Sequence, residues 1–220
     1  MPARYNVNSS NLLSISRELV PIPRLKYLMP SFWPIIPKST DNKPIIFKND
    51  AQSLINQSVQ GQNFMVKMAD FDVEEDKYLA MGFNFRGKID KDKALQALKW
   101  IQTNKKVSIS MYGKPIKKDI EAVQFHDTVP NPLSTDDLID IESQVTMIAN
   151  NTSMSRMFSE RLNKVFDLLY SQRAFIHHFL AEGMEEKEFV EARENTGWLE
   201  KDYLDSLCEK DNGDNDDDDD

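Results

Sequence analysis

The sequence predicts an α/β protein: a two-layer sandwich with a mixed sheet, then an antiparallel helical hairpin and a disordered acidic tail. β-rich runs alternate with a helical pattern in the middle of the chain, which is typical of helices packed on a sheet. A long stretch with apolar residues at three- and four-residue steps follows, and it reverses at a single glycine. The chain ends in a run of aspartates. We therefore divide it into a sandwich domain (1–150), a hairpin (151–209) and a tail (210–220).

Composition and charge narrow the classes of function. The chain has 220 residues, of which 40% are hydrophobic and 29% charged, enough to bury a core and stay in solution. The net charge is -9, and most of it lies in the aspartates between Asp211 and Asp220. An acidic tail on a nearly neutral body argues against nucleic acid as a partner. It favours partners that carry Lys and Arg.

Cysteine usage and hydropathy point to the cytoplasm. The single cysteine, Cys208, excludes an internal disulfide and suits a reducing compartment. No signal peptide is visible, and no stretch approaches the ~20 apolar residues of a membrane span. We therefore expect a soluble cytoplasmic protein with no membrane partner.

The first elements are bounded by prolines. Pro21 and Pro23 stop any early helix, and the run from Leu25 to Ile36 predicts a buried strand. A loop without periodicity extends from Pro37 to Pro44. A short helix is expected from Ala51 to Val59.

The following elements build the sheet. Lys91 to Ile101 is expected to be a helix, because its apolar residues recur at helical spacing. Strands are predicted at Tyr78–Phe85, Val107–Tyr112, Ile120–Phe125 and Val145–Ala149. This order of elements predicts a mixed sheet with helices on one face.

The hairpin is predicted from two apolar stripes. Asn150 to Ser153 offers N-caps for a single long helix, which Gly183 ends by taking a left-handed conformation. The expected core-facing stripe of this helix is Met154, Met157, Phe158, Leu162, Val165, Phe166, Leu169, Phe175, Ile176 and Phe179. The expected inner seam of the second helix is Phe189, Ala192, Thr196, Leu199, Tyr203 and Leu207. Two long helices joined so tightly should lie antiparallel.

Several segments resemble the tubulin family. The run from Phe166 to Glu194, FDLLYSQRAFIHHFLAEGMEEKEFVEARE, resembles the C-terminal helical hairpin of α-tubulin. LVPIPRLKYLMPSFWP, from Leu19 to Pro34, is similar to the corresponding tubulin strand, and Tyr78 to Gly87 ends in Arg-Gly as a tubulin strand does. The similarity is weak from Lys88 to Asp140. The long loop from His126 to Ile141 is closer to α-tubulin than to β-tubulin, so the chain resembles a divergent α-type tubulin.

The resemblance implies the C-terminal half of tubulin: its intermediate sandwich domain and its hairpin. In tubulins, GTP is held by a glycine-rich loop of the N-terminal half. The seven glycines of this chain never cluster as a phosphate cradle requires, so we expect no GTP site here. The position of the glutamate that helps hydrolysis in α-tubulin is Ser14, which cannot act as a general base. Glu18 could take the place of this glutamate only if the register of the short helix changed. We therefore expect neither a catalytic residue nor a cofactor.

Two further features suggest a metal site, but each has a plainer explanation. Adjacent helical residues point about 100° apart, so His177 and His178 cannot easily share one metal. The aspartate run lacks the glycine and closing glutamate of an EF-hand. No metal site is expected.

The acidic residues are the candidate partner-binding surface. They could form a solvated face only, but the resemblance favours a ridge read by motors and microtubule-associated proteins. The ridge residues are Glu182, Glu185, Glu186, Glu188, Glu191, Glu194 and Glu200, and the acidic tail contains Asp216, Asp217, Asp218, Asp219 and Asp220.

Two functions remain open at this point. The chain is either a structural component of the microtubule cytoskeleton, with other tubulin subunits as partners, or an interaction module that displays the hairpin and tail without polymerising. Enzymatic activity is a distant third.

Overall fold

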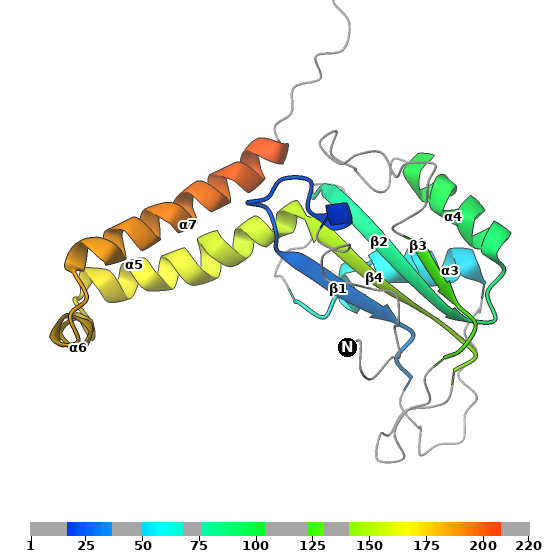
Figure 1. Ribbon diagram of the computed structural model, residues 1–220, viewed down its shortest axis with the longest axis horizontal. Helices are drawn as coiled ribbons and strands as arrows, with labels where there is room; N and C mark the ends of the chain where they lie inside the picture. Colours follow the sequence, from blue (N-terminus) through cyan, green and yellow to red (C-terminus); the bar gives the residue numbers. More distant parts are fainter. Residues whose placement is uncertain (1–16, 37–49, 68–75, 104–122, 130–140, 208–220) are drawn as a thin grey trace, which may run out of the picture.

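The computed structural model describes residues 17–36, 50–67, 76–103, 123–129 and 141–207. Within these ranges a four-stranded sheet has the order β1-β4-β2-β3 (Figure 1). Its strands are β1 (Leu28–Trp33), β2 (Tyr78–Gly87), β3 (Val123–His126) and β4 (Ser143–Asn151). β4 runs antiparallel to both β1 and β2, whereas β2 and β3 are parallel. The predicted mixed sheet is confirmed.

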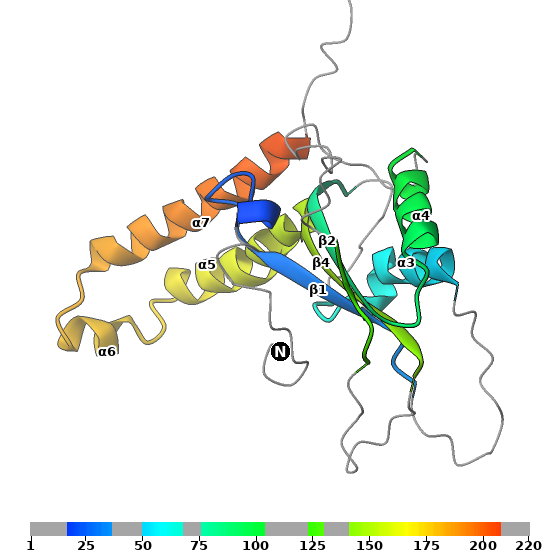
Figure 2. The ribbon, with the colours of Figure 1, turned by 45° about the vertical axis from the view of Figure 1, so that its right-hand side comes forward.

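Helices α3 (Ala51–Val59) and α4 (Lys91–Thr103) lie on the same side of the sheet (Figure 2). Side chains alternate along the strands, and the buried ones, such as Phe83 and Met147, form the core. The Tyr78 hydroxyl donates to the Val59 carbonyl at 3.1 Å and joins β2 to α3. The two-layer α/β arrangement is therefore confirmed.

Most sandwich elements match the sequence prediction. α3 has the predicted bounds, and α4 and β2 each extend two residues further than expected. β1 is shorter than predicted because the N–H of Leu25 bonds to Ile22 in a turn at 3.0 Å and does not join the sheet. The strand expected at Val107–Tyr112 and the loop at Pro37–Pro44 lie outside the described residues.

The hairpin continues directly from β4. Its elements are the 3-10 helix η2 (Thr152–Met154), the π-helix η3 (Met157–Asn163), α5 (Lys164–Ser171), α6 (Ile176–Ala181) and α7 (Glu186–Leu207). The Asn151 side chain accepts the N–H of Ser153 at 2.7 Å, which confirms the predicted cap. Figures 1 and 2 show α5 and α7 side by side in an arm that extends away from the sheet.

The prediction of one uninterrupted helix up to Gly183 is wrong. α5 ends at Ser171, and Arg173 and Phe175 have φ angles of 52° and 63°. These left-handed residues turn the chain before α6, and the N–H of Ala174 bonds to Leu169 across the turn at 3.0 Å. Gly183 is left-handed as predicted, with φ 93°, but it follows α6.

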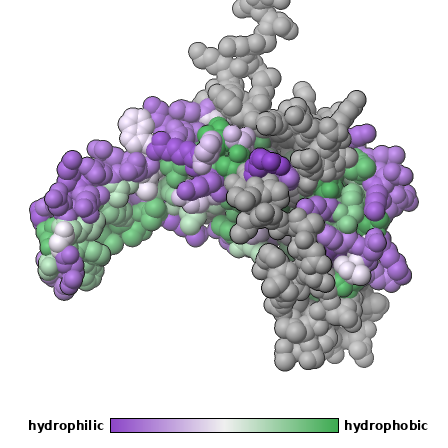
Figure 3. Space-filling model, viewed as in Figure 1, coloured by the Kyte–Doolittle hydropathy of each residue, from purple (hydrophilic) through white to green (hydrophobic). Residues whose placement is uncertain are grey.

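The first stripe is only partly core-facing. Met154, Phe158 and Ile176 are buried, whereas most other stripe residues are exposed. On α5 and the end of η3, four exposed side chains fall on one side of the helix, and we call them the α5 apolar arc: Leu162, Val165, Leu168 and Leu169. The arm extends beyond the sheet, so the described residues place no second layer beneath it. Figure 3 shows apolar side chains along the lower edge of the arm.

Candidate partner-binding surface

Polar pairs fix how the first half of the hairpin lies against α7. We call this first half, which contains η3, α5 and α6, the first arm. Asp167 accepts two hydrogen bonds from Arg193, at 2.7 and 2.9 Å. Nearer the sheet Asn163 donates to Glu200 at 3.2 Å, and at the far end Arg173 pairs with Glu186 at 3.1 Å. From the sheet outward, the paired residues increase in number along the first arm, whereas their partners on α7 decrease in number from Glu200 to Glu186. The predicted antiparallel arrangement is confirmed.

The Asp167–Arg193 pair is charged over a wide pH range. The hydrogen bonds from Arg193 are the main cause that lowers the pKa of the Asp167 carboxyl below its ordinary value. Both side chains are partly open to solvent, so the pair fixes geometry more than it adds stability.

Aromatic rings fill the outer end of the hairpin. Phe189 lies between two rings of the first arm, with centroid distances of 6.1 Å to Tyr170 and 5.6 Å to Phe179. Such pairs add stability beyond the area that they bury. They hold the first turns of α7 against the first arm.

The C-terminal half of α7 is anchored to the sandwich. Leu199 and Tyr203 are buried, and burial raises the pKa of the Tyr203 phenol to about 12. Arg24, in the segment before β1, forms a 3.1 Å salt bridge with Asp202. Of the predicted seam, Phe189 and Thr196 are half-buried and Ala192 is exposed, while the Leu207 side chain lies outside the described part.

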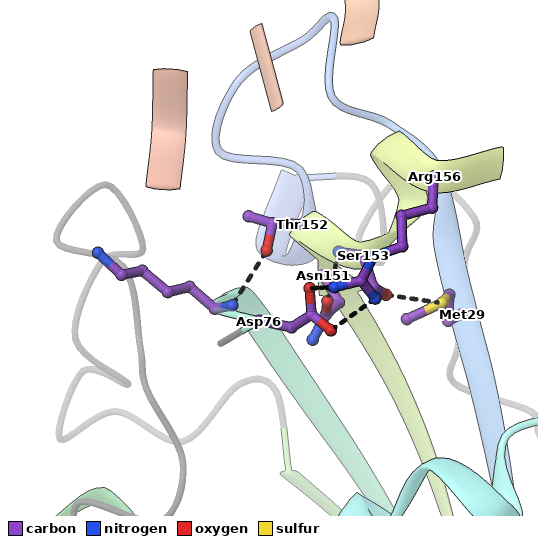
Figure 4. Close-up of polar contacts among 7 residues, drawn as sticks. Met29, Asp76, Asn151, Thr152, Ser153 and Arg156 are labelled. Carbon is purple, nitrogen blue, oxygen red and sulfur yellow. Dashed lines mark hydrogen bonds and ion pairs between the residues drawn. The ribbon is translucent and has the colours of Figure 1, made fainter. Parts of the chain in front are cut away.

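A polar joint connects the base of the hairpin to the sheet (Figure 4). Arg156 bonds both carboxylate oxygens of Asp76 at 3.0 Å, and the Asp76 side chain is only 3% exposed. The backbone N–H of Lys77 donates to the Thr152 hydroxyl at 3.0 Å. The labelled residues of the joint are Met29, Asp76, Asn151, Thr152, Ser153 and Arg156. They hold the start of the hairpin on the ends of β2 and β4.

The seven predicted ridge glutamates are divided among different surroundings. Glu200 faces the inner side of the hairpin through Asn163, and Glu186 pairs with Arg173. Glu191 pairs with Lys187 at 3.0 Å on the surface of α7. Glu182, Glu185, Glu188 and Glu194 are exposed, and the described residues include no ion pair for them.

The structure brings three of these glutamates into one row. Glu188, Glu191 and Glu194 are exposed and three residues apart, so each is a surface neighbour of the next. We call them the α7 acidic row. Such a row attracts a cationic partner through complementary charge.

The other sequence candidates are Ser14, the aspartates of the tail and the two adjacent histidines. Ser14 and the aspartates of the tail fall outside the described residues. The His177 and His178 rings are 4.0 Å apart, but the ranges described contain no group of three or more potential metal ligands. No described helix is both long and apolar enough to span a membrane.

Sequence reasoning missed two features. Trp198 is 55% exposed on the outer side of α7, and its position opposite the seam residues could have revealed this. The Asp76–Arg156 pair joins residues 80 positions apart, and no local pattern marks it.

Comparison with known proteins places the chain in a family. Residues 23–163 match the family described as "Tubulin C-terminal domain". The chain is 32% identical over 186 residues to the tubulin alpha-6 chain of Naegleria pringsheimi, which covers 84% of this chain and 39% of the relative. It is 36% identical over 205 residues to a tubulin alpha-2 chain of Emericella nidulans, covering 88% of this chain and 40% of the relative.

A third relative agrees in both identity and extent. The tubulin alpha chain of Dictyostelium discoideum is 32% identical over 206 residues, covering 92% of this chain and 42% of the relative. The chain thus spans about two fifths of the length of the curated relatives that it matches. The mixed sheet, the antiparallel hairpin and the family match agree: the chain belongs to the tubulin family, and the relatives named above are tubulin alpha chains.

Proposed function

We propose that this chain is a structural component of the microtubule cytoskeleton in the cytoplasm and associates with other tubulin subunits. The family match carries the proposal, because the relatives are tubulin alpha chains. The exposed α5 apolar arc adds support, since a contiguous apolar surface is typical of an interface.

The test is co-sedimentation of the full chain with preformed microtubules, together with gel filtration of the chain alone. We expect saturable pelleting by a chain that elutes as a defined species. A defined monomer that stays in the supernatant at every microtubule concentration contradicts the proposal. It supports the second function, an interaction module that does not polymerise.

We also propose that the α7 acidic row and the aspartate tail bind basic segments of motors or microtubule-associated proteins. The exposure of Glu188, Glu191 and Glu194 supports this proposal. The reason is electrostatic: exposed carboxylates attract Lys and Arg, and salt weakens the attraction.

A charge-matched set of variants tests the acidic row. Glu188→Gln, Glu191→Gln and Glu194→Gln together should weaken binding to a Lys-rich peptide, most strongly at low salt. The control removes three exposed acidic charges elsewhere, by Asp92→Asn, Asp127→Asn and Glu160→Gln. Equal losses in the two triple variants would mean that only net charge matters, and not this row. Deletion of Asp211–Asp220 should also lower the affinity, and an unchanged affinity across a salt series contradicts the role of the tail.

We propose further that these 220 residues hold no GTP. Two observations support this: the seven glycines do not cluster as a phosphate cradle requires, and Ser14 cannot act as a general base. Titration of the full chain with a fluorescent GTP analogue should show no saturable binding, and saturable binding would overturn the proposal.

A further inference from the structure

The turn between α5 and α6 is held in an unfavourable backbone conformation. Arg173 and Phe175 have φ angles of 52° and 63°, and neither is a glycine. Left-handed conformations are costly for residues that carry a Cβ, and more so for a bulky side chain such as that of Phe175. Figure 1 shows α6 out of line with α5 at the outer end of the hairpin. Two strained residues within three positions therefore interrupt the first arm.

The residues of this turn are suited to an ordinary helix. Gln172, Arg173 and Ala174 are among the better helix formers, and residues 172–175 include neither glycine nor proline. α5 ends directly before this segment, and α6 begins directly after it. By its composition the segment therefore permits α5 and α6 to join into one helix.

The apolar pattern also runs through the turn. Val165 and Leu169 belong to the α5 apolar arc, and Ile176 and Leu180 follow at steps of seven and four residues. In one continuous α-helix these four side chains would lie on the same side. In the structure Ile176 is buried, and it does not share a helix with the arc. A straight helix would therefore lengthen the α5 apolar arc by two residues that now belong to α6.

Two contacts with α7 depend on the turn. Arg173 pairs with Glu186 at 3.1 Å. The Phe179 ring lies 5.6 Å from that of Phe189, measured between centroids. Asp167 marks the side of α5 that faces α7, because its carboxylate accepts hydrogen bonds from that helix. In a straight helix Arg173 and Phe179 would each point about 120° away from that side, since they follow Asp167 by six and twelve residues. Both contacts therefore require the broken form.

The connection to α7 is long enough for a straight first arm. In a straight helix Ala181 would lie about 12 Å further along the axis than Arg173, which pairs with the first residue of α7. With the helix axes about 9 Å apart, the gap from Ala181 to Glu186 would be about 15 Å. The chain between these two residues can span up to about 17 Å when extended. α7 can therefore keep its bounds while the first arm straightens.

We infer that residues 172–175 are a conformational switch, at which the first arm changes from the broken form of the structure to a straight helix from Lys164 to Ala181. Relief of the two left-handed residues favours the straight form, and the two contacts with α7 favour the broken form. Because the salt bridge of Arg173 is exposed, salt weakens the broken form. The switch controls the length of the apolar surface that the first arm presents.

The experiment uses a pair of histidines as a probe for the straight helix in the full chain. Histidines at positions i and i+4 of one helix lie side by side and bind Ni²⁺ together. Ala174→His places an imidazole four residues before the natural His178. Because α6 begins only at Ile176, this pair shares one helix only in the straight form. His177→Ala and Cys208→Ser remove competing ligands, and circular dichroism verifies the fold of each variant.

A matched pair on α7, Glu188→His with Ala192→His, gives the affinity for Ni²⁺ of an uninterrupted helix. The pair across the turn should bind Ni²⁺ more weakly than the α7 pair, because only the minor, straight form can chelate the ion. Glu186→Gln with Phe189→Ala removes both contacts that hold the broken form. These two changes should raise the affinity of the pair across the turn roughly tenfold. The same chains without Ala174→His give the background binding.

Unchanged affinity after Glu186→Gln with Phe189→Ala overturns the switch, and so does a pair across the turn that binds as tightly as the α7 pair before any contact is removed. Local unfolding of α6 is distinguished by adding Arg173→Gly and Phe175→Gly, because glycine fits the left-handed turn and weakens a straight helix. The two glycines should abolish the tenfold gain. A gain that persists with them comes from unfolding and overturns the switch.

Discussion

Arg156 donates to both carboxylate oxygens of Asp76, at 3.0 Å each, across the joint between the sheet and the hairpin. The Asp76 side chain is almost fully buried, and that of Arg156 is 22% exposed. A buried carboxylate with its cation removed is strongly unfavourable, because water cannot replace the lost partner. The pair therefore couples the position of the hairpin to the stability of the sandwich.

Arg156→Ala should lower the free energy of unfolding by about 3–5 kcal/mol, since it leaves the Asp76 carboxylate buried without its partner. Urea unfolding of the full chain measures the change. Arg24→Ala is the matched control: it removes an exposed arginine from the pair with Asp202 and should cost about 1 kcal/mol or less. If the two variants have equal effects, the buried pair does not hold the joint.

Two glycines of the hairpin should respond to alanine in opposite directions. Gly197→Ala should raise the free energy of unfolding by about 1 kcal/mol, because Gly197 is in a helix interior. Gly183→Ala should lower it by about 1–2 kcal/mol, because its φ of 93° is left-handed although no atom would contact the added Cβ. Thermal unfolding followed by circular dichroism measures both. Shifts of the same sign would contradict the backbone assignment of one of them.

Phe175 should be replaceable with a gain in stability. It is 63% exposed and has a φ of 63°, so it buries little apolar area while holding a conformation unfavourable for a bulky residue. Phe175→Asn should raise the free energy of unfolding by up to about 1 kcal/mol, since asparagine tolerates this conformation. The control is Phe179→Asn, also exposed but in α6, which should give no gain. A loss of more than ~1 kcal/mol in Phe175→Asn would show that the ring packs more tightly than its exposure indicates.

His126 should make the sandwich less stable in mild acid. Burial lowers the pKa of His126 below its ordinary value of 6.5, the charge of Arg86 lowers it further, and Asp127 opposes both. The unfolded chain therefore takes up this proton first as the pH falls. Stability should decrease as the pH drops below about 6.5, until the folded protein is protonated too.

His126→Asn should flatten this dependence, and the exposed His178→Asn should not. Urea unfolding midpoints between pH 7.5 and pH 5 test the prediction, on either side of the ordinary histidine pKa of about 6.5. A slope that is unchanged in His126→Asn would assign the effect to other groups.

The sandwich could be predicted from sequence because its signals are local. Apolar and polar residues alternate along β2, and apolar residues recur at helical spacing along α4. The positions of both elements therefore follow from the periodicity of the apolar residues alone. The break between α5 and α6 could not be predicted. Residues 172–175 contain neither glycine nor proline, and apolar residues continue on both sides at helical steps. The contacts at this turn carry no local signal: Arg173 pairs with Glu186 of α7, and the N–H of Ala174 bonds to the carbonyl of Leu169.

The acidic surface was predictable as a set but not in its arrangement. Seven glutamates near the end of the chain are evident from the sequence, yet the register of the hairpin decides which of them face solvent. Glu200 faces inward because Asn163 lies opposite, whereas Glu186 is paired with Arg173 at the exposed outer end of the hairpin. Neither partner can be inferred from spacing along α7. Trp198 is different, since helical geometry turns it about 100° away from its buried neighbour Leu199 and so toward solvent.

The two anchors of the hairpin also determine how the molecule carries mechanical load. Arg24, in the segment before β1, forms a salt bridge with Asp202 of α7. Arg156, at the start of η3, pairs with Asp76 just before β2, and β4 continues directly into the hairpin. In single-molecule pulling on α7, Arg24→Ala should therefore lower the rupture force. A force applied to α7 is therefore shared among three neighbouring strands, β1, β4 and β2, instead of falling on a single edge strand.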